Sequence, residues 1–267
     1  MKKSEKESAI QAIVKSNVRT FAETFRERHE VDRDNPEGVI NSKINNVFIA
    51  VLGDEIRYYT ALVRSLDSSL GNTIENMAIG IAELSYEVHT QVEGHIYPQQ
   101  TKNIAEILEK YKRHEMAPDT DHYQGLRNKP STKRKHARHE SDYYLIDKKK
   151  KSHSLIEFKI GGDLDNKKAR SEKEALLEQF AILSNSLPKS ADINIYFATG
   201  YNKDGEGNEW NQGRVKQFFS EDELLIGKDF WNFITKMPNG YEVVLKAYKK
   251  EASTIKKTLE HIKKLYI

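Results

Sequence analysis

The sequence contains no cysteine among its 267 residues. Disulfide bonds and zinc sites built on thiolates are therefore excluded, and a reducing compartment such as the cytoplasm is the simplest expected location. Long hydrophobic runs are also missing, because no stretch approaches the ~20 consecutive apolar residues that a membrane-spanning helix needs. The first residues lead into an amphipathic segment, so we expect neither a secretory signal nor a membrane partner.

Neither sign of charge is in large excess. The chain has 43 Lys and Arg against 40 Asp and Glu, which gives a net charge of +3. Such a small excess neither requires nor excludes a nucleic-acid partner, so the distribution of the charges is more informative than their sum. Acidic residues are dispersed, whereas basic residues cluster in the middle of the chain, at residues 133–139, 148–151 and 167–170.

The hydrophobic pattern divides the chain into a helical first part, residues 1–116, and a mixed second part, residues 117–267. Polar residues with Pro and Gly predict a long, functionally important loop over 117–140. Short runs rich in Tyr, Ile and Phe then predict strands at 142–147, 154–160 and 193–199. We therefore expect an α/β fold, with a mixed sheet flanked by helices and a helical N-terminal part. A single domain is expected over residues 1–267.

The first two predicted strands are joined by a polar turn and form a predicted hairpin. In the second strand, Glu157 and Lys159 share one face because side chains alternate along a strand. If Asp147 pairs with Ser154, then Asp142 lies opposite Lys159, and paired residues point to the same face. Asp142, Glu157 and Lys159 are then expected to converge. A slip of one residue in the register would bring Asp147 to this face instead.

These residue types together indicate the hydrolysis of a phosphodiester. Asp142 and Glu157 offer the hard oxygen ligands that Mg²⁺ binds, which leaves positions for a phosphate oxygen and water. A lysine beside the metal, here Lys159, can orient the water and stabilise the charge that develops on phosphorus. The alternative is purely structural: Glu157 and Lys159 form only a salt bridge on an edge strand.

Asp142, a hairpin and then Glu157-Phe158-Lys159 resemble the signature of PD-(D/E)XK nucleases, although Ser141 stands where that signature has proline. Three further segments resemble Type II restriction endonucleases of the TdeIII family: residues 64–75, 161–170 and 227–233. The resemblance implies a restriction-endonuclease-like fold and Mg²⁺-dependent cleavage of double-stranded DNA at a short palindrome, GGNCC in kind. It also implies a homodimer, which matches the twofold symmetry of such a site, and a cognate DNA methyltransferase as genetic partner.

The resemblance adds further candidates outside the hairpin. A helix before the catalytic hairpin often carries a glutamate near the metals in this superfamily, which implies a catalytic role for Glu75; a solvated helix glutamate is the alternative. Glu178 and Gln179, on the helix after the motif, are further candidates for such a role near the metals. A capping box at residues 171–174 predicts the start of that helix.

Basic residues in the middle of the chain are expected to contact DNA phosphates, which supply affinity. The candidates are Arg127, Lys133, Arg134, Arg138, Lys167, Lys168 and Arg170. The 127–139 segment is the expected reader of bases, because arginine can bridge guanine in the major groove. The lysines at 148–151 are expected only to form a hairpin turn exposed to solvent, with no role in DNA binding. Two other functions stay open: a structure-selective repair or recombination nuclease of the same superfamily, and a DNA-binding protein that does not cleave.

Overall fold

The computed structural model describes residues 2–127, 134–161 and 164–267. Two compact units make up the chain. Residues 1–81 and 242–267 form the first, here called the helical unit, and residues 82–241 form the second, here called the sheet unit. No helix in the described part of the chain is both long enough and apolar enough to cross a membrane. The prediction of one domain over 1–267 stays a prediction.

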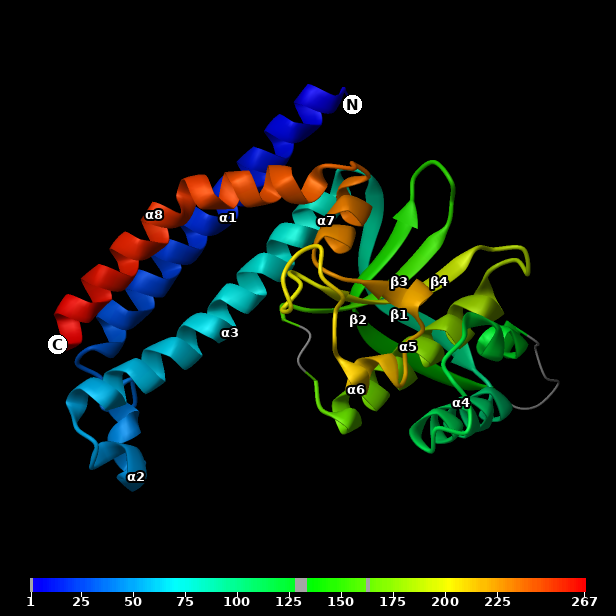
Figure 1. Ribbon diagram of the computed structural model, residues 1–267, viewed down its shortest axis with the longest axis horizontal. Coiled ribbons are helices and arrows are strands. Elements are labelled where there is room, and N and C mark those ends of the chain that lie inside the picture. The colour runs from blue at the N-terminus through cyan, green and yellow to red at the C-terminus, as the bar shows by residue number, and fades with distance from the viewer. Residues whose placement is uncertain (1, 128–133, 162–163) are drawn as a thin grey trace. The chain divides into compact units, whose positions relative to one another are not determined.

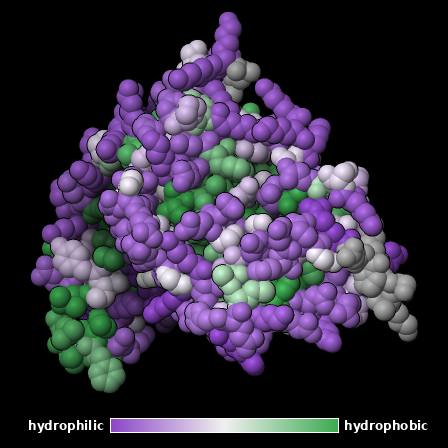
Figure 2. All heavy atoms as spheres, turned by 45° about the vertical axis from the view of Figure 1, so that its right-hand side comes forward, coloured by the Kyte–Doolittle hydropathy of each residue, from purple (hydrophilic) through white to green (hydrophobic). Residues whose placement is uncertain are grey.

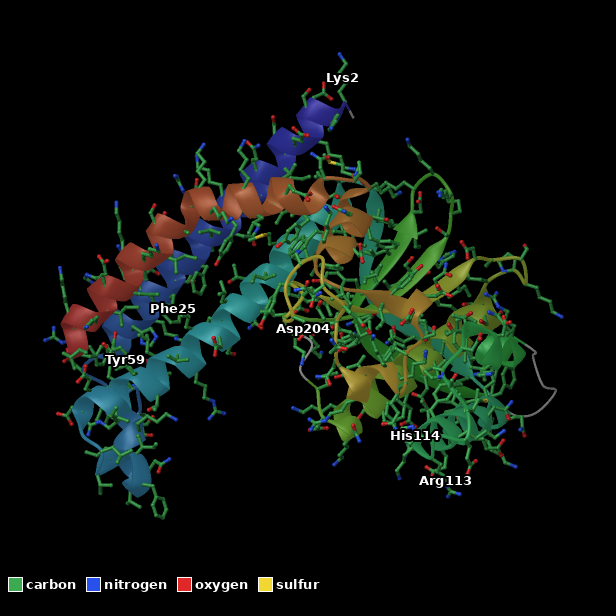
Figure 3. All side chains as sticks on the ribbon, in the orientation of Figure 1. Lys2, Phe25, Tyr59, Arg113, His114 and Asp204 are labelled. Atoms are coloured by element: carbon green, nitrogen blue, oxygen red, sulfur yellow. The ribbon has the colours of Figure 1, made fainter. Side chains whose placement is uncertain are left out.

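The helical unit consists of long helices with apolar stripes that face one another. Its elements are α1 (Lys3–Asp32), the 3-10 turn η1 (Asn41–Asn45), α2 (Val47–Ala50), α3 (Asp54–Glu83) and α8 (Gly240–Tyr266). Along α1, Ile10, Val14 and Val18 recur every four residues and are fully buried, which is the spacing of one helix face. Phe25 of α1 is almost fully buried too, whereas Tyr59 near the start of α3 is partly exposed (Figure 3).

The sheet unit contains one five-stranded mixed sheet in the order β1-β2-β3-β4-β5 (Figure 1). The strands are β1 (Tyr86–Ile96), β2 (Lys135–Asp147), β3 (His153–Lys159), β4 (Ile193–Thr199) and β5 (Leu224–Leu225). The pairs β1–β2 and β2–β3 are antiparallel, whereas β3–β4 and β4–β5 are parallel. The parallel ladder brings the carboxyl ends of β3 and β4 to the same edge of the sheet, where Lys159 pairs with Thr199.

Helices cover both faces of this sheet. The remaining elements of the unit are α4 (Pro98–Lys112), η2 (Thr120–Arg127), α5 (Asn166–Ser186), α6 (Gly213–Lys216), η3 (Glu221–Glu223) and α7 (Lys228–Thr235). On one face, Leu155 of β3 joins a core with Leu176 and Phe180 of α5. On the other face, Tyr143 and Phe158 pack against Phe230 of α7. Coverage on both faces explains why β3 is buried almost throughout.

The expected fold class is confirmed: a mixed sheet is flanked by helices and follows a helical N-terminal region. Two details of the expected division were wrong. The segment 1–116 is not entirely helical, because β1 lies within it, and the expected 117–140 loop contains η2 and the first residues of β2. Outside Tyr86, Val92 and Ile96, β1 is exposed or half-buried, and so is β2 before Ser141. Polar residues therefore obscure the alternation that marks a strand.

Candidate active site

The β2–β3 hairpin has a register two residues away from the expected one. Leu145 pairs with Ser154 and Tyr144 with Leu155, where the sequence predicted that Asp147 would pair with Ser154. The turn is tighter than expected because the Asp147 carboxylate accepts the backbone N–H groups of Lys149 and Lys150 at 2.7 and 2.9 Å. A shift of two residues preserves the alternation of faces, so Asp142 still lies on the same face as Glu157 and Lys159.

The side chains of Asp142, Glu157 and Lys159 come together on the face covered by α5. The Lys159 ammonium forms an ion pair with Glu157, and its Nζ lies 3.8 Å from Asp142 Oδ2. Asp142 Oδ2 also accepts the backbone N–H of Phe158 at 2.8 Å, a hydrogen bond that fixes the carboxylate against β3. The Glu157 side chain is the least exposed of the three, at 12%. The sequence predicted this convergence, and the structure has it.

A third carboxylate, from Glu172 on α5, completes the cluster. Its Oε1 lies 3.7 Å from Lys159 Nζ. Sequence reasoning missed Glu172 because it assigned residues 171–174 to a capping box. The helix in fact begins at Asn166, with Asp165 accepting the N–H of Lys168 at 2.8 Å as its cap. With the start at 166, Glu172 falls in the second turn, close after the motif, but its contact with Lys159 depends on how α5 packs on the sheet.

Within this cluster, Glu157 and Lys159 have strongly shifted pKa values. Burial, followed by the charge of Asp142, raises the pKa of Glu157 to about 8. Burial alone would lower the pKa of Lys159, but the charges of Glu157, Asp142 and Glu172 outweigh it and raise this pKa well above its ordinary value. Lys159 is therefore an ammonium at neutral pH. An excess of buried negative charge is the electrostatic setting that favours a bound cation.

Asp147 lies away from this cluster. Its Oδ2 forms an ion pair with Lys236 Nζ at 2.6 Å. Lys236 directly follows α7, the helix that packs on the opposite face of the sheet. Burial opposes the ionisation of Asp147, but the Lys236 ammonium and the turn N–H groups outweigh it and lower the pKa to about 2. Asp147 therefore has a structural role: its carboxylate stabilises the hairpin turn.

The other candidates that the resemblance added, Glu178, Gln179 and Glu75, lie in other surroundings. Glu178 pairs with His139 of β2 at 3.1 Å, and the buried Gln179 donates to the carbonyl of Glu140 at 3.3 Å. Glu75 lies on α3 in the helical unit. Its catalytic role stays a prediction.

The predicted DNA-binding residues differ in their surroundings. Arg134, Arg138, Lys167 and Lys168 are exposed, and Arg170 is half-buried with its Nη1 3.5 Å from Glu109. Arg127 is engaged within the unit, because its Nη1 donates to the carbonyl of Ala191 at 2.9 Å and its guanidinium covers the Phe180 ring. Lys133 lies outside the described residues. DNA binding by all seven stays a prediction.

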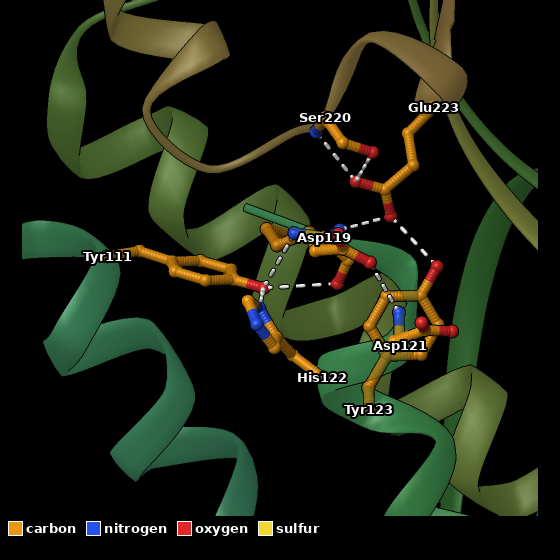
Figure 4. A network of polar contacts seen from close by, with 8 residues as sticks. Tyr111, Asp119, Asp121, His122, Tyr123, Ser220 and Glu223 are labelled. Atoms are coloured by element: carbon orange, nitrogen blue, oxygen red, sulfur yellow. Dashed lines mark hydrogen bonds and ion pairs between the residues drawn. The ribbon is translucent and has the colours of Figure 1, made fainter. Parts of the chain in front are cut away.

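A buried ion pair anchors α5 directly beside Glu172. Lys173 is completely buried and forms an ion pair with Glu223 of η3. The Glu223 carboxylate also accepts hydrogen bonds from the Tyr123 hydroxyl at 3.0 Å and from the N–H of Ser220 at 2.8 Å (Figure 4). A buried pair is tolerated when its remaining lone pairs are satisfied in this way. The network thereby fixes the helix that carries Glu172.

The donor set of the cluster suits a hard divalent cation. Within the described ranges, no three His, Asp or Glu side chains are arranged as a ready-made metal cage. Mg²⁺ does not require one, because it usually keeps several waters and binds through one or two carboxylates together with phosphate oxygens. The paired carboxylates of Asp142 and Glu157, at a partly open position, fit that requirement.

Comparison with known proteins identifies the family. The family described as "Type II restriction endonuclease, HinfI" matches residues 6–252. The chain belongs to the HinfI family. Membership of the HinfI family indicates Type II restriction endonuclease activity on DNA, and it confirms the expected restriction-endonuclease resemblance. The narrower resemblance to TdeIII enzymes stays a prediction. Neither a curated protein nor a solved structure matches the chain.

Proposed function

We propose that this chain is a Mg²⁺-dependent Type II restriction endonuclease that hydrolyses phosphodiester bonds of double-stranded DNA at a short palindromic site. The observation that carries the proposal is the cluster of Asp142, Glu157 and Lys159 on one face of the hairpin, with Glu172 beside it. A salt bridge with no further role would not require three carboxylates around one lysine, because each added half-buried carboxylate loses solvation and repels the others.

Each side chain has a distinct part in this proposal. Asp142 and Glu157 would hold the cation, and Glu172 adds negative charge beside them. When bound, Mg²⁺ lowers the pKa of water and polarises the scissile phosphate. Lys159 supplies a positive charge beside these carboxylates. It donates hydrogen bonds that orient the attacking water and stabilise the negative charge that develops on the phosphate.

A homodimer that acts in the cytoplasm belongs to the same proposal. A palindrome has twofold symmetry, so two copies related by a twofold axis can place one active site on each strand. Exposed Arg134, Arg138, Lys167 and Lys168 would supply phosphate contacts. A cognate DNA methyltransferase is the expected genetic partner, because unmodified host DNA would otherwise be cut.

One experiment separates this proposal from its two alternatives. Long double-stranded DNA is incubated with the protein in Mg²⁺ or in chelator, and the ends produced are sequenced. Discrete fragments that share a sequence at their ends, formed only with Mg²⁺, support the proposal. Cutting confined to branched or damaged DNA would instead identify a structure-selective repair nuclease. DNA binding with no cutting under any metal condition would identify a binding protein.

The choice between the two aspartates can be tested directly. Asp142→Asn is expected to abolish cleavage, because it removes a charged oxygen from the cluster. Asp147→Asn is expected to retain most activity and to lower thermal stability, because it weakens the pair with Lys236. Cleavage rates and melting temperatures of both variants provide the comparison. The reverse pattern of activities would show that Asp147 is the catalytic residue.

The recognition sequence is the second testable detail. We propose an interrupted palindrome with GG and CC half-sites, GGNCC in kind, which rests on the TdeIII resemblance alone. Guanine is recognised in the major groove by donors such as Arg134 and Arg138. Mapping the cut ends on a phage genome is expected to yield a G·C-rich consensus. A consensus dominated by A·T pairs would refute these half-sites and leave the nuclease assignment standing.

A further inference from the structure

A group of large hydrophobic side chains is exposed on the helical unit. Six of them lie within residues 44–56, with exposed fractions from 43% to 82%: Ile44, Val47, Phe48, Val51, Leu52 and Ile56. We call these six the α2 patch. Figure 2 shows a dense hydrophobic group at the lower left of the view, where Figure 1 places α2. Together they expose an area on the order of 600–700 Å², at or above the largest patch of a typical monomer.

The patch residues belong to one short stretch of the chain, and Figure 2 shows hydrophobic residues gathered together at this place. The six residues lie close together along the chain, from η1 through the single turn of α2 to the start of α3, and all six side chains are exposed. The neighbouring stripe of α3 faces its own unit: Tyr58 is buried and its ring lies 6.0 Å from that of Tyr266 on α8. The contacts inside the helical unit therefore bury Tyr58 and leave Ile56 of the same helix exposed.

The charges around the patch restrict the kind of partner. Lys43, Asp54, Glu55 and Arg57 border it, so positive and negative residues are equal in number, and Arg57 already pairs with Asp54 at 2.8 Å. A DNA-binding surface needs an excess of positive charge. A helix that lies on a membrane usually has a polar face rich in lysine and arginine. A neutral apolar centre with both signs at the rim is instead typical of an interface between protein subunits.

We infer that the α2 patch is the surface through which two copies of this chain pair about a twofold axis. The exposed apolar area approaches the roughly 800 Å² that each partner contributes to an interface of standard size. A twofold axis places the same patch on both sides and lets Lys43 of one copy approach the acidic residues of the other. The inference names the surface of the proposed homodimer and therefore rests on that part of the proposed function.

A pair of charge substitutions tests the inference. Phe48→Glu with Val51→Glu is expected to weaken the dimer by at least about 100-fold, because two apolar side chains at its centre become like charges on both copies. Ile267→Glu is the matched control, since Ile267 is also exposed, at 51%, and lies outside the patch. Sedimentation over a range of concentrations measures the dissociation constant, and circular dichroism verifies that each variant is folded.

Cross-linking gives a second measurement that does not depend on a destabilising change. The chain has no cysteine, so a single introduced cysteine can form a disulfide only with another copy. Under mild oxidation, at least one of Val47→Cys, Val51→Cys and Ile56→Cys is expected to give a covalent dimer, and Ile267→Cys is not. A cross-link confined to the control position would overturn the inference.

Cleavage and dimerisation are measured on the same samples, so the two proposals can fail separately. Loss of the dimer in the double variant, with the control intact, supports the patch even if the unaltered protein does not cut DNA. A double variant that stays dimeric, or an unaltered protein that is monomeric at micromolar concentration, overturns the patch whatever the cleavage result.

Discussion

Replacing Lys159 with alanine is expected to lower the rate of DNA cleavage by about 10²–10³-fold, the cost of removing one charged donor from a developing anion. The ammonium is surrounded by the carboxylates of Asp142, Glu157 and Glu172, so no other side chain of the cluster can supply its positive charge. Single-turnover rates at saturating protein measure the effect on the chemical step. DNA affinity is measured separately by fluorescence anisotropy in chelator and is expected to change little.

Glu157→Gln provides the companion variant. Glutamine keeps the size of the side chain and removes a carboxylate oxygen that would bind the cation, so cleavage is expected to disappear while the fold is retained. Lys149→Ala is the matched control for the lysine variant, because it makes the same chemical change on the exposed turn of the same hairpin. Cleavage at full rate by both Lys159→Ala and Glu157→Gln would show that the cluster is only structural.

The location of the cluster was predictable because it depends on the alternation of side chains along a strand. This alternation stays the same when the predicted strand pairing is wrong by two residues. Side chains alternate with a period of two, so Glu157 and Lys159 share a face in any pairing. Asp142 lies on the same face whenever the pairing of β2 with β3 differs from the predicted one by an even number of residues. The observed pairing differs by two residues. The sequence alone could not exclude an odd shift, since that depends on how Asp147 closes the turn. The turn hydrogen bonds from Lys149 and Lys150 decide it.

The missed features lie where tertiary contacts outweigh local pattern. Strand β1 contains Glu87, Thr90 and Glu93 at exposed positions, so its sequence has no continuous apolar alternation. Its place in the sheet comes from pairing with β2. Glu172 was missed for a related reason: its approach to Lys159 depends on how α5 packs against the sheet. A correct helix start at Asn166 would have placed it near the motif, but not in contact with it.

Breaking the buried pair of Lys173 and Glu223 is expected to have the largest effect on stability. Lys173→Met leaves the Glu223 carboxylate buried without its cation, and Glu223→Gln leaves a buried ammonium whose pKa is already lowered by burial. Removing one partner of such a pair costs about 3–5 kcal/mol. Both single variants are therefore expected to unfold at much lower urea concentration than the unaltered protein, and to cut DNA more slowly because α5 carries Glu172.

Intrinsic tryptophan fluorescence measures the loss of stability in the sheet unit, which contains Lys173 and Glu223. Both tryptophans, Trp210 and Trp231, are buried in the sheet unit, so their emission reports the unfolding of that unit.

The double variant Lys173→Met with Glu223→Gln distinguishes an unpaired charge from lost packing. It removes both charges. The glutamine oxygen can take the place of Oε2 and accept from the Ser220 N–H, and the amide NH2, in the place of Oε1, can donate to the Tyr123 hydroxyl. If the cost of each single change is an uncompensated buried charge, the double variant is expected to recover most of the stability, to within about 1–2 kcal/mol of the unaltered protein. A double variant less stable than either single one would instead show that Lys173 stabilises α5 mainly through its packing against the Tyr123 and Phe219 rings.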